Sequence, residues 1–148
     1  GAMEGCLLGL PSIAFSQPYT HPHQPRWETA TQHGADVARR ALAMGIPRNV
    51  LINVNFPAIP AEAVKGIRVV RQGFHDYSRG SIVEGTDPRG YRYYWFGLHG
   101  IEHSPGHDTD LEAIDDGYIA VTPLQLDLTH DASLAALRGA YAARLASD

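Results

Sequence analysis

The segment from Gly117 to Thr129 constrains the fold of this chain more than any other part of the sequence. It reads Gly-Tyr-Ile-Ala-Val-Thr-Pro-Leu-Gln-Leu-Asp-Leu-Thr, a short β-branched run that follows a glycine and leads into a Thr-Pro pair. β-Branched and aromatic residues favour strands, whereas a proline within such a run marks its end or an edge position. The segment therefore predicts a strand over 118–121 that ends at Thr122 and Pro123.

The composition is that of a globular domain. The 148 residues are 44% hydrophobic and 19% charged, and a chain of this length can bury a core. The formal charge of -4 does not favour a general nucleic-acid or anionic-membrane binder, although it is compatible with a small anionic substrate. Cys6 is the only cysteine, so an intrachain disulfide is excluded.

No apolar run approaches the roughly 20 residues that cross a bilayer, and no signal-peptide pattern opens the chain. We therefore expect a cytoplasmic protein.

The rest of the sequence predicts helices alternating with strands, as in an α/β fold. Short apolar runs bounded by proline predict strands that are buried on both faces, and a longer amphipathic stretch that stops at Gly45 predicts a helix. The expected strands cover 13–15, 50–57, 67–72 and 91–97, and the expected helices cover 27–44, 110–116 and 133–146, the last with Ser133 as N-cap. Residues 74–96 predict a protruding hairpin, because 78–90 carry repeated Gly, Asp and Pro turn signals.

Five blocks of sequence carry a family resemblance. They are Ala2-Met3-Glu4-Gly5 leading to Ser16, Leu51-Ile52-Asn53-Val54-Asn55-Phe56-Pro57, Lys65 to Gly73, Asp87-Pro88-Arg89-Gly90 with Tyr93-Tyr94-Trp95, and Gly117 to Thr129. In this order and spacing they resemble the SurE family, which consists of metal-dependent phosphatases acting on nucleoside monophosphates. The chain departs from the family pattern at Ala120, where serine is usual, and at the inserted His107-Asp108.

The resemblance implies a Rossmann-like three-layer sheet, to which the carboxy-terminal part adds a protruding β-hairpin and a terminal helix. Residues 1–148 correspond to the carboxy-terminal part of this single SurE-like domain, and we expect the metal-binding amino-terminal half to precede residue 1. Gly1-Ala2-Met3 could be the remnant of a cleaved tag, but Ala2-Met3-Glu4-Gly5 matches the family and favours native sequence.

The same resemblance places the metal site outside this chain. In the family a divalent ion is held by two adjacent aspartates of an Asn-Asp-Asp-Gly motif, a serine, and an asparagine of a Ser-Gly-x-Asn loop. The chemistry of phosphate ester cleavage favours Mg²⁺ or Mn²⁺ for this ion. Asp115-Asp116-Gly117 is the only Asp-Asp-Gly sequence here, and it precedes a different strand. We therefore expect neither a metal ligand nor a catalytic residue within 1–148.

Three polar residues at or near the ends of predicted strands are the candidate substrate contacts. Ser16 ends the first strand, and Asn53 and Asn55 share one face of the next because side chains alternate along a strand. Binding sites of open α/β sheets lie beyond the carboxyl ends of the strands, so we expect these residues at the rim of the pocket. Two alternatives stay open: Ser16 could simply begin a turn, and the asparagines could bond neighbouring backbone.

Three functional hypotheses follow. The resemblance implies a 5′/3′-nucleotidase in the intact protein, in which residues 1–148 supply pocket rim and subunit contacts and are inactive alone. A second hypothesis is a non-catalytic assembly module, since a long hairpin that forms a homodimer or homotetramer covers its exposed edges. A third is an independent zinc- or nucleic-acid-binding domain, based on His103, His107, Asp108 and Asp110 or on the aromatic residues of 91–96.

Overall fold

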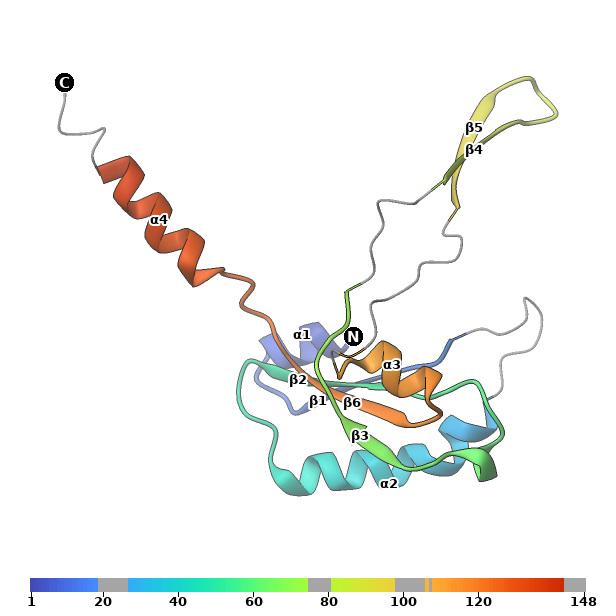
Figure 1. Ribbon diagram of the computed structural model, residues 1–148, viewed down its shortest axis with the longest axis vertical. Coiled ribbons are helices and arrows are strands. Elements are labelled where there is room, and N and C mark those ends of the chain that lie inside the picture. Colours follow the sequence, from blue (N-terminus) through green and yellow to red (C-terminus); the bar gives the residue numbers. More distant parts are fainter. Residues whose placement is uncertain (19–26, 75–80, 98–105, 107, 143–148) are drawn as a thin grey trace.

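The centre of the molecule is a four-stranded mixed sheet (Figure 1). The computed structural model describes residues 1–18, 27–74, 81–97, 106 and 108–142. The strands are β1 (Ser12–Ser16), β2 (Val50–Asn55), β3 (Ile67–Val69) and β6 (Ile119–Gln125), in the spatial order β1-β2-β6-β3. β1 and β2 are parallel, β6 runs antiparallel to β2, and β3 runs parallel to β6. The carboxyl ends of β1 and β2 therefore meet at one edge of the sheet.

Helices cover both faces of this sheet and give it three layers. Helix α2 (Glu28–Met44) lies on one face, and α1 (Ala2–Leu7) and α3 (Asp110–Asp115) lie on the other (Figure 1). The main core joins α2 to the strands through Val37, Ile52, Val54, Phe56 and Ile119. A smaller core joins α3 to β6 through Val70, Ala113 and Ala120. The 3-10 turn η1 (Ala61–Ala63) packs beside α2. This architecture confirms the predicted α/β class.

The strand that begins after Gly117 is longer than the sequence predicted. β6 continues through Pro123 to Gln125, and Pro123 lies opposite Ile52 in the ladder with β2. Pairing with β3 stops at Val121, so beyond that residue β6 has β2 as its only neighbour among the described strands. A proline, which has no backbone N–H, is tolerated in a strand where one side is unpaired. The predicted end at Thr122 and Pro123 was therefore wrong.

The first strand is less buried than predicted. Ile13 and Ala14 are half-buried and Phe15 is exposed, whereas the sequence indicated a strand covered on both faces. Among the described residues β1 has only β2 as a neighbour, which makes it an edge strand and leaves its outer side open. The ring of Phe15 nevertheless meets Phe56 edge to face, with centroids 5.1 Å apart.

The sequence predicts one strand of the hairpin, over 91–97, but not the strand that pairs with it. β4 (Ser81–Thr86) pairs antiparallel with β5 (Arg92–Gly97), so the stretch 78–90 is not a turn throughout. The turn itself is confined to the residues after Thr86, where Asp87 Oδ1 accepts the N–H groups of Arg89 and Tyr91, each at 2.9 Å. Ile67–Val69, which the sequence placed beside the hairpin, belongs to the central sheet as β3.

The chain continues after β6 into helix α4 (Asp131–Ala142), which projects away from the sheet as the hairpin does (Figure 1). Its start differs from the prediction, because the helix begins two residues before Ser133. His130 performs the capping, since its Nδ1 accepts the Ser133 N–H at 3.3 Å and contacts the Ser133 hydroxyl at 2.7 Å. The end of the predicted helix, 143–146, lies outside the described residues. Among the described helices, none combines the length and apolar character needed to cross a membrane.

Candidate functional site

The carboxyl edge of β1 and β2 brings two of the three candidate residues together. Ser16 and Asn55 are the last residues of their strands and are direct partners in the parallel register. The Ser16 hydroxyl bonds Asn55 Oδ1 at 2.6 Å, and the Ser16 carbonyl accepts the Phe56 N–H at 2.9 Å. Ser16 is exposed, whereas Asn55 is half-buried. The parallel pairing therefore brings the exposed Ser16 hydroxyl into hydrogen-bond contact with the Asn55 side-chain amide.

A buried carboxylate supports this pair from the opposite side. Asp110, which is only 8% exposed, receives Asn55 Nδ2 on Oδ2 at 3.2 Å. Its other oxygen, Oδ1, accepts the Gly73 N–H at 2.7 Å. The backbone holds Asp110 in place, since its N–H donates to the Arg71 carbonyl at 2.9 Å. Ser16, Asn55, Asp110 and Gly73 thus form one continuous chain of hydrogen bonds, which we call the edge relay.

Asn53 does not join the edge relay. It lies opposite Ala14 and Thr122 in the sheet and is half-buried, on the same face of β2 as Asn55. Within the part of the chain that the structure describes, its side chain forms no hydrogen bond. The histidines of the following loop, His21 and His23, lie outside the described residues.

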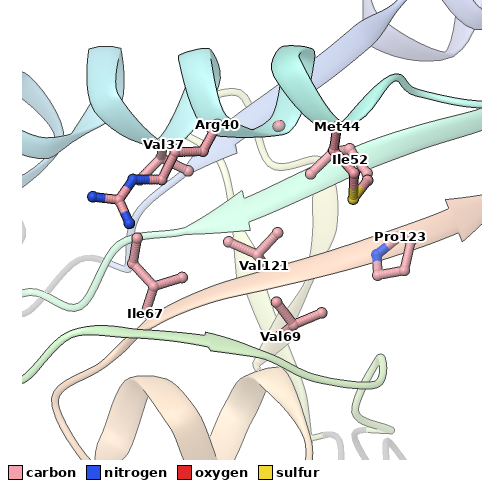
Figure 2. A pocket seen from close by; sticks show the side chains of 9 residues that line it. Val37, Arg40, Met44, Ile52, Ile67, Val69, Val121 and Pro123 are labelled. Atoms are coloured by element: carbon pink, nitrogen blue, oxygen red, sulfur yellow. The ribbon is translucent and has the colours of Figure 1, made fainter.

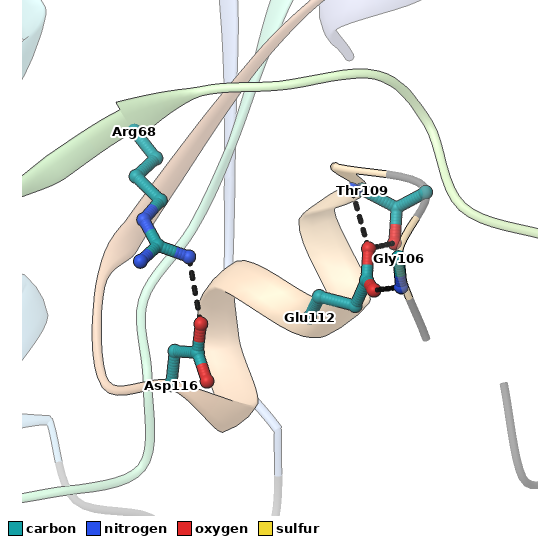
Figure 3. A network of polar contacts seen from close by, with 5 residues as sticks. All are labelled: Arg68, Gly106, Thr109, Glu112 and Asp116. Atoms are coloured by element: carbon teal, nitrogen blue, oxygen red, sulfur yellow. Dashed lines mark hydrogen bonds and ion pairs between the residues drawn. The ribbon is translucent and has the colours of Figure 1, made fainter. Parts of the chain in front are cut away.

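Helix α3 positions Asp110 and is itself anchored at both ends (Figure 3). At its start, Glu112 Oε2 accepts the Thr109 N–H at 3.0 Å and the Thr109 hydroxyl at 3.3 Å, while Glu112 Oε1 accepts the Gly106 N–H. At its end, Asp116 pairs with Arg68 of β3 at 2.7 Å. That hydrogen bond raises the pKa of the Arg68 guanidinium, which also stacks on Tyr118 at 3.8 Å.

The Asp-Asp-Gly sequence at the end of α3 has a structural role. Asp116 is occupied by Arg68, and Gly117 adopts a φ of 85° that lets the chain turn into β6. Among the described residues no three His, Cys, Asp or Glu side chains lie close enough to hold a metal ion. The residues that the structure describes therefore do not fit a divalent metal site.

One of the four residues of the zinc hypothesis, Asp110, belongs to the edge relay. Both carboxylate oxygens of Asp110 already accept hydrogen bonds, from Gly73 and Asn55. His103 and His107 lie outside the described residues, and Asp108 adopts a positive φ of 51° in the turn before α3. To bind zinc, Asp110 would have to share or give up these hydrogen bonds.

Asp127, just beyond β6, stabilises the connection to α4. Its Oδ1 accepts the Thr129 N–H at 2.9 Å. Hydrogen bonds from the Thr129 side chain and backbone lower the pKa of the Asp127 carboxyl. The interaction is a short-range turn of the kind that aspartate commonly forms.

An apolar pocket opens on the other face of the sheet, between α2 and β3 (Figure 2). It has a volume of about 330 Å³, and its lining is Val37, Arg40, Ala41, Met44, Ile52, Ile67, Val69, Val121 and Pro123. Arg40 is the only charged residue in this lining. Nucleotide sites require polar groups that converge on the phosphate, so this pocket suits apolar side chains better than a nucleotide.

Gly73 tests how tightly the relay is packed. A Cβ at this position would lie 2.7 Å from Leu111 Cγ and Cδ1 and 2.9 Å from Asp110 Oδ1. We expect Gly73→Ala to destabilise the fold by about 1–3 kcal/mol, because α3 must shift to admit the methyl group. Chemical denaturation of the full-length protein measures this cost. Gly139→Ala is the matched control, since nothing lies within 4 Å of its Cβ position; an equal effect of both changes would contradict the packing described here.

Sequence reasoning missed the contribution of Asp110 to this site. Thr109 and Glu112 form a Thr-x-x-Glu pattern that predicts a helix start at this point, and this was the one local signal available. The partners of Asp110 lie 55 and 37 residues away along the chain, and no periodicity reports contacts at such distances.

Comparison with known proteins identifies the family. The model of the family described as survival protein SurE matches residues 1–79. A 5′-nucleotidase SurE of Erythrobacter litoralis is 56% identical over 137 residues, which are 92% of this chain and 54% of the relative. A 5′-nucleotidase SurE of Caulobacter sp. (strain K31) is 46% identical over 143 residues, which are 95% of this chain and 53% of the relative.

A solved structure agrees with these relatives. The crystal structure of the SurE protein from Aquifex aeolicus matches with a TM-score of 0.75 and 35% sequence identity, over 95% of this chain and 56% of that one. The chain thus spans about half the length of the curated relatives it matches. With its sheet, its order of sequence blocks and these matches in agreement, the chain belongs to the SurE family.

Proposed function

We propose that the full-length protein that carries this chain hydrolyses nucleoside 5′- or 3′-monophosphates with a divalent metal ion. The observation that carries the proposal is the 56% identity to a relative named 5′-nucleotidase SurE over 92% of this chain. The edge relay is consistent with it, because it lies at the carboxyl ends of parallel strands, where ligands of α/β proteins bind.

We place the metal site and the rim of the substrate pocket in different parts of the full-length protein. A divalent cation neutralises charge on the phosphoryl oxygens and activates the attacking water. Its ligands belong to sequence preceding residue 1, as the family resemblance implies, and Mg²⁺ or Mn²⁺ suits an oxygen-rich site of this kind. Residues 1–148 contribute the rim of the pocket, with Ser16 and Asn55 as its best supported members and Asn53 as a third candidate.

The test is phosphate release from nucleoside monophosphates by the full-length protein before and after removal of metal. A metal ion contributes several kcal/mol of transition-state stabilisation, so we expect chelation to lower the rate by about 100-fold or more. Restoring Mg²⁺ or Mn²⁺ should recover the activity. Turnover that survives complete chelation, or its absence with every metal supplied, would contradict the proposal.

We further propose that the protein is a homodimer or homotetramer held together by the hairpin and α4. In the hairpin Ile82, Tyr94, Trp95 and Phe96 are exposed, and α4 has no buried residue among those described. Leu134, Leu137 and Tyr141 occupy helical spacing on α4 and form an apolar stripe. Exposed apolar surface of this extent is typical of subunit interfaces, and the apolar pocket beside α2 offers further surface of the same kind.

A further inference from the structure

The edge relay has a fixed hydrogen-bond polarity, which follows from the chemistry of its buried member. Asp110 accepts hydrogen bonds on both oxygens, from the Gly73 N–H and from Asn55 Nδ2, so the side of Asn55 that faces Asp110 is its NH₂ group. The amide oxygen of Asn55 then faces Ser16 and accepts from it. This assignment does not depend on distinguishing oxygen from nitrogen in the amide, because the opposite orientation would face oxygen with oxygen.

The consequence reaches the exposed end of the relay. The Ser16 hydroxyl has one proton and two acceptor lone pairs, and the proton is used for Asn55. Ser16 therefore offers lone pairs to a ligand at the carboxyl edge, and its carbonyl is already taken by Phe56. Phosphate oxygens at neutral pH are themselves acceptors, so they are mismatched to this hydroxyl. A hydroxyl group of the sugar is a donor and is matched to it.

We propose that Ser16 is a specificity-determining contact that accepts a hydrogen bond from a sugar hydroxyl of the nucleotide, and that Asp110 is the positioning residue that sets its polarity. The inference rests on the proposed nucleotidase function and deepens it. Asp110 acts through Asn55, because no bond joins Asp110 to Ser16 directly. An ordered water molecule is the other donor that the same geometry would accept.

Two variants test the hydrogen-bond polarity of the edge relay without a large change in side-chain volume. Ser16→Ala removes the acceptor. Asp110→Asn keeps the volume and retains an oxygen for the Gly73 N–H, but it presents NH₂ to Asn55, which must then turn over and offer its own NH₂ to Ser16. The Ser16 proton would then point outward and repel a donor. Asp36→Asn, on the exposed face of α2 beside Arg39 and Arg40, is the matched control.

The experiment compares kcat/KM of the full-length protein for ribonucleoside monophosphates and for their 2′-deoxy and 3′-deoxy forms. We expect Ser16→Ala and Asp110→Asn each to lower kcat/KM for the ribonucleotide by about 3- to 10-fold, the range for one neutral hydrogen bond. For the analogue that lacks the contacting hydroxyl, neither should change kcat/KM. The double variant should lose no more than either single variant, because both remove the same contact.

The results distinguish the two possible hydrogen-bond donors to Ser16. If kcat/KM falls only for substrates that carry a particular sugar hydroxyl, that hydroxyl is the donor. If kcat/KM falls equally for all substrates in both single variants, with no further loss in the double variant, the donor is an ordered water, and only the proposed hydrogen-bond polarity of the edge relay is supported. The inference is overturned if Asp110→Asn behaves like Asp36→Asn, or if the losses of the single variants multiply.

A second readout does not depend on activity. In nuclear magnetic resonance spectra of the full-length protein, we expect the Asn55 side-chain NH₂ protons to exchange slowly in the wild type and in Ser16→Ala. In Asp110→Asn their exchange and shifts should change, while the Gly73 amide stays protected. Fast exchange of the Asn55 side-chain NH₂ protons in the wild type would contradict the edge relay, even if hydrolysis is observed. A full-length protein with no turnover but with protected Asn55 protons would instead refute the proposed function and leave the polarity standing.

Discussion

Replacing Phe56 with alanine should destabilise the fold by about 3–5 kcal/mol, the usual cost of deleting a fully buried phenylalanine side chain. Phe56 is 0% exposed and belongs to the main core with Val54 and Ile119. Its ring also meets Phe15 edge to face at an interplanar angle of 86°. The cavity left by alanine would lie directly beneath the carboxyl ends of β1 and β2.

Chemical denaturation of the full-length protein measures this cost. Phe74→Ala is the matched control, because Phe74 is 85% exposed and its loss should change the free energy of unfolding by less than about 0.5 kcal/mol. A change below about 1 kcal/mol for Phe56→Ala would mean that the core is not centred on β2. The backbone N–H of residue 56, which donates to the Ser16 carbonyl, is kept in this variant, so the cost reports the loss of the buried ring.

Replacing Trp95 and Phe96 together with serine should break the proposed assembly. The two side chains lie on opposite faces of β5 and are 67% and 82% exposed in the single chain, so neither supports the central sheet. Interface tryptophans often contribute 2 kcal/mol or more to association, which corresponds to a Kd at least about 30-fold higher after their removal. Sedimentation of the full-length protein over a range of concentrations should show this shift.

The hairpin offers a control for the assembly experiment. Arg89→Ser changes an exposed residue of the turn. Arg89 binds Asp87 through its backbone N–H, which the substitution keeps. It should leave the association unchanged, because rim charges contribute little to affinity. A wild-type protein that is monomeric at every workable concentration would contradict the assembly proposal, and so would an unchanged Kd in the Trp95 and Phe96 variant.

Local patterns were sufficient to predict most of the sheet and its helices. The helix ending at Gly45 is α2, and the apolar run with two asparagines is β2, because each segment has a clear period and an adjacent glycine or proline that ends it. The errors occurred where neighbours along the sheet decide the structure. Pro123 continues β6 since one side of that strand is open, and 81–86 form a strand because 92–97 pair with them.

Prediction of the candidate site was limited by the same cause. The sequence predicts Ser16 at the end of one strand and Asn55 on one face of the next, and the parallel register brings Ser16 Oγ to 2.6 Å from Asn55 Oδ1. Asp110 was not singled out for this site, since its contact with Asn55 joins α3 to a strand 55 residues earlier. The capping residue His130 was also missed, because histidine is less common at helix starts than the serine that follows it.

The division of function between residues 1–148 and the rest of the protein is tested most directly by comparing the full-length protein with residues 1–148 alone. Both samples are given nucleoside monophosphates with Mg²⁺ or Mn²⁺, after each has been shown to unfold cooperatively, and released phosphate is measured. We expect metal-dependent hydrolysis by the full-length protein and none above background by residues 1–148. Metal-dependent turnover by the purified 148-residue chain, or an inactive full-length protein, would contradict it.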